Sequence, residues 1–261
     1  MLIVFDIGNT TTGVGLFQGK KLRADWRIKS DREKTADEYG IMLRNLLEHG
    51  KFQVQKIKGA IISSVVPPLT PVIQSACEKY FRLKPLVVGP GIKTGIPILY
   101  ENPTEVGSDR IVVARAAFEK YGGPCLVVDF GTATTFDVIS ARGEYLGGAI
   151  APGLEISAEA LYLRTARLPR IEVRRPKSAI GRTTVSSMQS GLFHGYVGLV
   201  RNIIAQISTE LAARPTVVAT GGLAGLVAGE IPEIAHCEPD LVLQGLRLIY
   251  EKNRTGDRVR K

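Results

Sequence analysis

One arrangement of local structure occurs twice in this chain: a buried strand, a glycine-containing turn that starts with aspartate, a second strand, a tight turn and a third strand. The first copy turns at Asp6-Ile7-Gly8-Asn9-Thr10 and the second at Asp129-Phe130-Gly131-Thr132. Two short motifs can agree by chance, but agreement of the hairpins that follow is much harder to produce by chance. A duplicated three-stranded unit, followed each time by alternating helices and strands, predicts two similar α/β halves that face one another.

The hydrophobic pattern assigns further elements and places the boundary between the halves after residue 115, giving parts 1–115 and 116–261. In the first half we expect strands at 2–5, 11–17, 22–28, 57–66 and 86–88, and helices at 35–50, 69–81 and 102–121. In the second half we expect strands at 126–128, 134–140, 144–150 and 216–219, and helices at 155–163, 191–211 and 241–250. Residues 251–261 are predicted to form a frayed basic tail.

At 261 residues the chain is long enough for one large domain or two small ones, and 44% hydrophobic with 23% charged residues is typical of a soluble globular protein. A strand begins at once, without a signal-peptide pattern, and no apolar run reaches the ~18 residues of a membrane span. The three cysteines are widely spaced, which favours a reducing compartment over a disulfide framework or zinc site. We therefore expect a cytoplasmic protein that has no membrane partner.

The net charge of +9 allows two interpretations, nucleic-acid binding or a generally basic surface. Basic residues occur throughout the chain. The densest stretch, from Arg164 to Arg182, is not accompanied by a helix-turn-helix, RNA-recognition or zinc-finger pattern. A positive surface also attracts an anionic nucleotide. The second interpretation is favoured, and no nucleic-acid partner is expected.

The segment from Asp6 to Gly13 has the features of a phosphate-binding turn. Gly8 allows the backbone to approach a phosphate closely, and successive backbone N–H groups with Asn9 and the threonine hydroxyls supply donors. Because Asp6 would repel a bare phosphate, its presence implies an intervening cation, most naturally Mg²⁺. The alternative is a hairpin turn capped by an Asx side chain.

Two segments of the second half offer matching groups. Gly131 and Thr132 would bind phosphate from the other side, and Asp129 could hold a second cation, although a strand-end aspartate can also just cap a turn. The glycine-rich run from Thr220 to Gly225 follows a buried strand. Its glycines, Gly221 and Gly222 included, would let a nucleotide base or ribose lie against the backbone, but such turns also exist for packing alone.

Asp109 is the best candidate for a general base. Phosphoryl transfer needs positioning, metal and one carboxylate to accept the hydroxyl proton. Asp109 is expected in the first turns of a helix, where the dipole favours anions, but an ordinary helix-start aspartate shows the same pattern. The neighbouring Arg110 could bind a substrate carboxylate as a fork, or form a surface ion pair.

Together these motifs resemble those of the type III pantothenate kinases, bacterial enzymes of the actin-like ATPase superfamily. The resemblance covers almost the whole chain, and it is the order and spacing of the motifs that make it specific. The segments that carry it are Asp6-Ile7-Gly8-Asn9-Thr10, Gly107-Ser108-Asp109-Arg110, Asp129-Phe130-Gly131-Thr132-Ala133-Thr134-Thr135, Gly147-Gly148-Ala149-Ile150-Ala151-Pro152-Gly153 and Thr220-Gly221-Gly222-Leu223.

The resemblance implies a duplicated actin-like (ribonuclease H-like) α/β fold and a homodimer. It also implies the activity: transfer of the ATP γ-phosphate to the 4'-hydroxyl of pantothenate, the first step of coenzyme A biosynthesis. The implied cofactors are Mg²⁺ with ATP and a monovalent cation, K⁺ or NH₄⁺. The alternatives are a regulator of transcription from the same family, and a phosphohydrolase on the same fold.

The resemblance also implies a role for individual residues. Asp109 would accept the pantothenate proton, Asp129 would ligate the monovalent cation, and Asp6 would hold Mg²⁺. Thr184 would complete the pantothenate site, either of its own subunit or of the partner subunit. ATP would be bound by Asp6, Ile7, Gly8, Asn9, Thr10, Thr11, Thr12, Gly13, Thr132, Gly221 and Gly222, and pantothenate by Tyr100, Gly107, Ser108, Asp109, Arg110 and Thr184.

Ser108 departs from the family pattern, which commonly has alanine at this position. The change adds a small polar group that could alter substrate contacts, but the neighbouring Asp109 and Arg110 are intact. Binding DNA would require neither these two residues nor Asp6 and Asp129, which argues against a pure regulator. In a phosphohydrolase, Tyr100, Arg110 and Thr184 would lack an obvious role.

Overall fold

The computed structural model describes residues 1–255, which form two compact units. The first unit contains Met1–Pro97, Glu101–Ala116 and the chain from Leu241 onward, and the second contains Ile98–Tyr100 and Ala117–Asp240. The sequence-based boundary after residue 115 lies beside the Ala116–Ala117 division. The structure differs in grouping the C-terminal helix with the first unit, because that helix buries its apolar side in the first unit's core.

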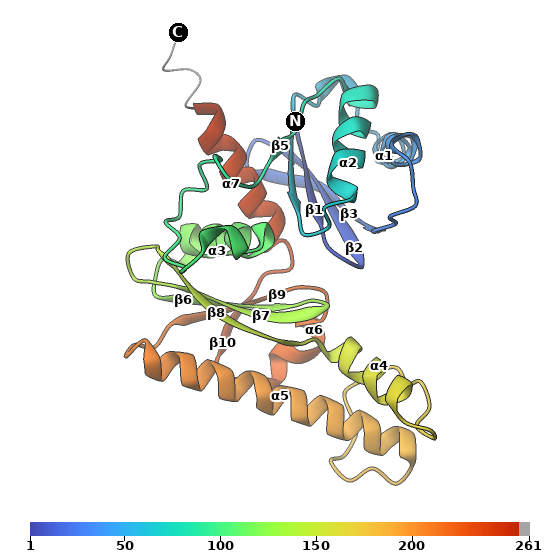
Figure 1. Ribbon diagram of the computed structural model, residues 1–261, viewed down its shortest axis with the longest axis vertical. Helices are drawn as coiled ribbons and strands as arrows, with labels where there is room; N and C mark the ends of the chain where they lie inside the picture. Colours follow the sequence, from blue (N-terminus) through green and yellow to red (C-terminus); the bar gives the residue numbers. More distant parts are fainter. Residues whose placement is uncertain (256–261) are drawn as a thin grey trace. The chain divides into compact units, whose positions relative to one another are not determined.

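The first unit is built on a five-stranded mixed sheet whose strand order is β3-β2-β1-β4-β5 (Figure 1). The central strand β1 pairs antiparallel with β2 and parallel with β4, while β3 pairs antiparallel with β2 and β5 pairs parallel with β4. The strands are β1 (Leu2–Ile7), β2 (Thr11–Gln18), β3 (Lys21–Lys29), β4 (Gly59–Ser64) and β5 (Leu86–Val87).

The second unit repeats this topology strand by strand. Its order is β10-β9-β6-β7-β8, with β6 in the centre, antiparallel β7 and β8 on one side and parallel β9 and β10 on the other. The predicted duplication and the actin-like α/β fold are thereby confirmed. The strands are β6 (Cys125–Phe130), β7 (Ala133–Ile139), β8 (Tyr145–Pro152), β9 (Thr216–Thr220) and β10 (Ile234–Cys237).

Helices cover both faces of the first sheet, as Figure 1 shows. One face, carrying Ile3, Phe5 and Ile7, packs against α1 (Ala36–His49) and α2 (Leu69–Ala76), which continues as a π-helical turn at Cys77–Phe81. The opposite face carries Leu2, Val4 and Ile61 and packs against α3 (Ser108–Tyr121) and α7 (Leu241–Thr255).

In the second unit the long helix α5 (Thr184–Glu210) runs along one face of the sheet (Figure 1). It buries Tyr196, Val200 and Ile204 against the inward residues of β6 and β7. The remaining helices of the second unit are α4 (Leu154–Arg164) and α6 (Ala224–Val227). Short 3₁₀ turns occur at Val54–Lys56 and Pro103–Glu105 in the first unit and at Ala228–Glu230 in the second.

The predicted helix at 102–121 starts too early. Pro103–Glu105 is a single 3₁₀ turn, in which Asn102 Oδ1 accepts a hydrogen bond from Thr104 N (3.3 Å), and the extended Val106 separates it from α3, which begins at Ser108. Asn102 and Pro103 therefore begin a single 3₁₀ turn, and not the long helix that their pattern indicated.

Three further predictions differ from the structure. The helix predicted at 191–211 begins at Thr184, because Thr183 caps it and Ser186, in place of the usual Glu or Gln, completes a capping box. Helix α7 continues to Thr255 in place of a tail from 251, and residues 256–261 of the predicted tail lie outside the described residues. The edge strand β10 was not predicted, because it is mostly exposed and has no apolar run.

Among residues 1–255, no helix is both long enough and apolar enough to cross a membrane.

Candidate functional site

The first phosphate motif forms the turn between β1 and β2. Gly8 N donates to Thr11 O (3.1 Å), and a side-chain Cβ at Gly8 would lie 3.0 Å from that oxygen, so the tight turn requires glycine. Asn9, Thr10 and Thr11 are exposed at its tip. The tip therefore presents polar groups to solvent, while the Gly8 amide serves the turn itself.

Two contacts from the end of β3 hold this turn in place. Thr12 is buried and its Oγ1 lies 2.8 Å from Ser30 Oγ, while Ser30 N donates to Thr10 O (3.0 Å). Arg32 Nη2 donates to Asn9 Oδ1 (3.3 Å), which places a guanidinium beside the turn. The sequence motif did not reveal Arg32, because it lies on a different segment and has no fixed spacing from the turn.

Asp6 lies on the face of the first sheet that α3 and α7 cover. It is paired in register with Ser63 of β4, and the alternation along β1 puts it on the same side as Leu2 and Val4. Ser63 Oγ lies 2.9 Å from Ser108 Oγ at the start of α3. The structure therefore brings the segment 107–110, predicted to bind substrate, to the strand next to Asp6.

The Asp109 carboxylate is held in the first turn of α3. Its Oδ1 accepts a hydrogen bond from Arg110 N (2.8 Å), and a Cβ at Gly107 would lie only 2.5 Å from that oxygen. Burial raises the pKa of Asp109 above its ordinary value, against the opposing effects of this hydrogen bond and of the Arg110 charge. A carboxylate with a raised pKa is a better proton acceptor than an ordinary aspartate.

The second phosphate motif forms the turn between β6 and β7, and glycines from two other segments pack against it. A Cβ at Gly221, whose φ is +91°, would lie 2.3 Å from Asp129 Oδ1. A Cβ at Gly153 would lie 2.2 Å from Thr132 O, and Gly153 N donates to that oxygen (3.1 Å). The structure thus packs Gly221 and Gly153 against the turn that carries Asp129 and Thr132, within the second unit.

A buried hydroxyl pair supports this second turn as well. Thr134 Oγ1 is hydrogen-bonded to the hydroxyl of Tyr196 on α5, and the Phe130 and Tyr196 rings lie 6.1 Å apart. Thr134 pairs with Phe130 as Thr12 pairs with Ile7 in the first unit, so the two threonines are equivalent in the duplicated fold. Tyr196 was not predicted, since only the tertiary packing of α5 reveals it.

Two predicted substrate residues belong to different parts of the second unit. Tyr100 packs over β8, where a Cβ at Gly147 would lie 3.3 Å from its ring, and its centroid is 6.5 Å from that of Tyr145. Thr184 is the first residue of α5 and is exposed. No recorded hydrogen bond or ring contact joins Thr184 to Tyr100 among the described residues.

Metal binding at these turns would depend on few protein ligands. Among residues 1–255 no cluster of three or more His, Cys, Asp or Glu side chains could hold a metal ion. Asp6 and Asp129 each offer hard oxygen ligands from one carboxylate. A single carboxylate at each turn fits Mg²⁺ bound with a nucleotide, because Mg²⁺ usually keeps several waters and takes only one or two carboxylates besides the phosphates.

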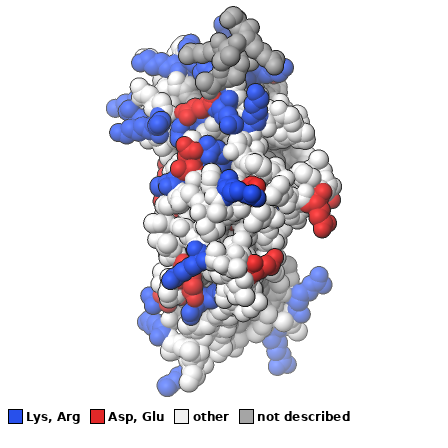
Figure 2. Space-filling view, turned by 90° about the vertical axis from the view of Figure 1, so that its left-hand side faces the viewer, with Lys and Arg blue, Asp and Glu red and all other residues white. Residues whose placement is uncertain are grey.

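Figure 2 shows Lys and Arg side chains scattered over the visible face with Asp and Glu among them.

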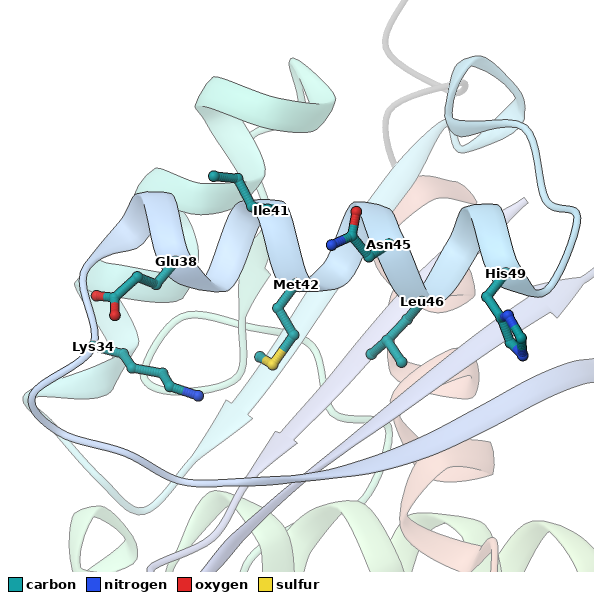
Figure 3. Close-up of a pocket in the computed structure, with 7 residues that line it drawn as sticks. All are labelled: Lys34, Glu38, Ile41, Met42, Asn45, Leu46 and His49. Carbon is teal, nitrogen blue, oxygen red and sulfur yellow. The ribbon is translucent and has the colours of Figure 1, made fainter.

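A separate groove lies along α1 (Figure 3) and is lined by Lys34, Glu38, Ile41, Met42, Asn45, Leu46 and His49. None of the predicted site residues lines this groove.

Comparison with known proteins connects the motifs to one family. The family described as type III pantothenate kinase matches residues 2–206. The type III pantothenate kinase of Syntrophus aciditrophicus is 54% identical, over 97% of this chain and 100% of that protein, and the one of Koribacter versatilis is 52% identical, over 100% and 99%. A solved structure of a conserved protein assigned to the Baf family of transcriptional activators, from Campylobacter jejuni, has a TM-score of 0.61 at 20% identity and covers 97% of this chain and 99% of its own, which shows the fold alone.

Proposed function

The chain belongs to the type III pantothenate kinase family, and we propose the residues by which it transfers the γ-phosphoryl group of ATP to the 4'-hydroxyl of pantothenate, in coenzyme A biosynthesis. The observation that carries the proposal is the Asp109 carboxylate, partly buried at the start of α3 with a raised pKa and joined through Ser108 to the strand beside Asp6. A positioned carboxylate is what phosphoryl transfer to an alcohol requires of the protein.

In this mechanism Asp109 acts as the general base. Its carboxylate accepts the proton of the pantothenate hydroxyl while the hydroxyl oxygen forms its bond to the γ-phosphorus. The bond between the γ-phosphorus and the bridging oxygen breaks, and that oxygen leaves on ADP. Gly107 leaves room for the carboxylate at its present place, because a Cβ there would lie 2.5 Å from Asp109 Oδ1 and would displace it. Arg110 binds the pantothenate carboxylate as a guanidinium fork.

The ATP phosphates are bound by the turn from Asp6 to Gly13. The exposed Asn9, Thr10 and Thr11 supply polar contacts, while Ile7 and Thr12 are buried and support the turn from within. A divalent metal accompanies ATP, and Asp6 is the proposed Mg²⁺ ligand, directly or through water. When bound, the metal would neutralise part of the phosphate charge.

The β6–β7 turn supplies the remaining nucleotide and cation contacts. Thr132, Gly221 and Gly222 contact ATP, and Asp129 binds a monovalent cation, K⁺ or NH₄⁺. The support for this assignment is the packing of Gly221 directly against Asp129 and the backbone of Phe130, which leaves a side-chain-free surface beside the carboxylate. Tyr100 and Thr184 are proposed to complete the pantothenate site.

We also propose that the protein is a cytoplasmic homodimer in which Thr184 serves the substrate site of the partner subunit. Large apolar side chains are exposed on α4, on the segment that follows it and on the first turn of α5. They are Ile156, Tyr162, Leu163, Ile180 and Val185. Figure 1 shows α4 beside the N-terminal part of α5, the helix that begins at Thr184. Exposed apolar side chains on neighbouring elements favour burial by a second copy.

A mass measurement by light scattering tests the homodimer. Leu163, which is 66% exposed, is the residue to change: Leu163→Glu should give a monomer with a raised KM for pantothenate. Ile41→Glu, at a 51% exposed residue of α1, is the matched control and should leave the dimer intact. A monomeric wild-type protein would contradict the proposal.

The kinase assignment is tested by ADP release from ATP with and without pantothenate. A pantothenate kinase releases ADP only when pantothenate is present. A phosphohydrolase on this fold releases it equally in both reactions, and a purely regulatory protein releases none. Mass spectrometry of the product then shows whether one phosphoryl group has been added to pantothenate.

A further inference from the structure

The two sheets differ at two positions of their second strands, β2 and β7, next to Asp6 and Asp129. Asp6 and Val4 of β1 pair with Gly13 and Gly15 of β2, whereas Asp129 and Val127 of β6 pair with Thr135 and Asp137 of β7. In the first sheet the glycines make room for Leu243 of α7: a Cβ at Gly15 would lie 3.1 Å from its Cδ1. The second sheet has polar side chains where the first has none, so these were not required by the duplicated fold.

Asp137 is a fully buried carboxylate, with 0% of its surface exposed. Its Oδ2 accepts a hydrogen bond from Thr135 Oγ1 (2.9 Å), and its Oδ1 accepts one from the Tyr145 hydroxyl (2.9 Å). Thr135 is the register partner of Asp129, and the alternation along the strands places Asp129, Thr135 and Asp137 on one face of the sheet. Burying a carboxylate is costly unless hydrogen bonds compensate it, so this group needs a reason to be here.

The second hydrogen-bond partner of Asp137 leads toward Tyr100. Tyr145 O accepts a hydrogen bond from Leu99 N (2.8 Å), and the Tyr145 and Tyr100 rings lie 6.5 Å apart. Gly147 of the same strand leaves the space that the Tyr100 ring occupies. The hydroxyl and the backbone of Tyr145 thus connect the buried carboxylate with the segment that carries Tyr100.

We propose that Asp137 is a positioning residue for two ligands of the second unit, pantothenate at Tyr100 and the monovalent cation at Asp129. Through the Tyr145 hydroxyl it fixes the surface on which Tyr100 rests, and through Thr135 it fixes the strand position opposite Asp129. The inference rests on the proposed roles of Tyr100 in pantothenate binding and of Asp129 in cation binding. Asp137 itself touches neither the transferred phosphoryl group nor the reacting hydroxyl.

Two single variants test the two hydrogen bonds of Asp137 separately. Tyr145→Phe removes only the hydroxyl on the Tyr100 side and should raise the KM for pantothenate about 3–10-fold, the effect of one lost hydrogen bond, with kcat and the KM for ATP within about twofold of wild type. Thr135→Val should instead raise the K⁺ concentration for half-maximal activation by a similar factor, and leave the KM for pantothenate within about twofold.

The Asp137→Asn variant should show both effects together. Asparagine replaces one carboxylate oxygen by an NH₂ group and removes the negative charge, so one hydroxyl loses its acceptor and the other keeps only a weaker, neutral one. Adding Tyr145→Phe to Asp137→Asn should then raise the KM for pantothenate less than the product of the two single effects, because the two residues share one hydrogen bond. If Asp137→Asn does not fold, the Tyr145→Phe and Thr135→Val results still decide the proposal.

Tyr121→Phe is the matched control, because it also removes a tyrosine-to-carboxylate hydrogen bond within the second unit, to Glu238. It should change neither constant. The inference is overturned if Tyr145→Phe has the same KM for pantothenate as wild type. It is also overturned if all variants raise the KM for pantothenate, the KM for ATP and the K⁺ requirement by the same factor.

Tyr100→Ala and Asp129→Asn serve as reference variants for the roles on which the inference rests. If they leave the KM for pantothenate and the K⁺ dependence unchanged, the assigned site is wrong. If they alter these constants while Tyr145→Phe and Thr135→Val do not, only the role of Asp137 fails.

Discussion

Ser63 Oγ lies 2.9 Å from Ser108 Oγ, and this pair joins the strand next to Asp6 to the helix that begins with the proposed general base. Ser108 Oγ also accepts from Ser64 N (3.1 Å) and lies 3.2 Å from Ser64 O. A hydroxyl with three such neighbours fixes the first turn of α3 against the end of β4. Ser108, which departs from the family pattern, therefore has a structural role of its own.

Ser108→Ala should weaken this attachment. Ser63 is fully buried, so the change leaves a buried hydroxyl short of a partner and should lower the free energy of unfolding by about 1–2 kcal/mol. The KM for pantothenate should rise more than the KM for ATP, because Asp109 and Arg110 follow directly. Urea denaturation and steady-state kinetics measure the two effects.

The double variant Ser63→Ala/Ser108→Ala provides the control. Removing both hydroxyls should cost less stability than the sum of the two single changes, since the two serines share one hydrogen bond and neither hydroxyl is left facing an empty place. Additive losses would show that the two serines act independently.

Asp109→Asn should reduce kcat by about 10²–10⁴-fold, the usual contribution of a general base, while ATP still binds. Wild-type kcat/KM should fall as the pH drops through the raised pKa of Asp109, since the protonated carboxyl cannot accept the hydroxyl proton. The variant should lack this acid limb. ADP release across pH and calorimetric titration with ATP measure these outcomes, and near-wild-type activity would remove Asp109 as the base.

The same substitution should make the fold more stable at pH 7. Because burial raises the folded-state pKa of Asp109, the folded protein binds more protons than the unfolded chain, and stability falls as the pH rises through that window. A neutral asparagine avoids this cost, so Tm at pH 7 should be higher than that of wild type. The difference from wild type should disappear at acid pH.

Asp37→Asn is a control of opposite sign. Hydrogen bonds from Lys79 and Tyr80 lower the pKa of Asp37, so this carboxylate stabilises the fold above its unfolded pKa, and the effect is lost as pH falls through its folded pKa. The variant should therefore have a slightly lower Tm at pH 7. A Tm rise in both variants would point to a general effect of removing negative charge from this basic protein.

Gly221→Ala should disrupt the turn that carries Asp129. The positive φ alone costs about 1–2 kcal/mol for alanine, and the new methyl would collide with Asp129 Oδ1 and with the backbone of Phe130. We expect a lower Tm and a raised KM for ATP. Gly225→Ala, four residues later in α6 with open space around its Cβ position, should leave both unchanged. Equal behaviour of the two variants would exclude the packing of Gly221 as the cause.

Activity should be higher in K⁺ or NH₄⁺ than in Na⁺ at equal ionic strength, through Asp129. Asp129→Asn should flatten this preference, because the neutral amide removes the charge that binds the cation. Rates in the three chloride salts, for both proteins, measure the effect. Equal wild-type rates in all three salts would contradict the role of Asp129.

The sequence by itself determined the duplication, the two turns for which we propose phosphate binding, and the general position of Asp109. These features depend on local rules: the period of the apolar residues, the need for glycine at Gly8, and the repetition of one hairpin around Asp6 and Asp129. Local chemistry also placed α1, because Thr35 and Glu38 form a capping box.

Only the tertiary structure decided which distant segments meet. The contact of Ser63 with Ser108, the cluster of Asp137 and Tyr145, the hydroxyl of Tyr196 under the second turn and the place of α7 in the first unit all join residues that no local pattern relates. Such contacts arise because strands and helices bury their apolar faces against elements far along the chain. The sequence therefore located the groups that we propose for the chemistry, and the packing of the sheets and helices determined which residues hold them in position.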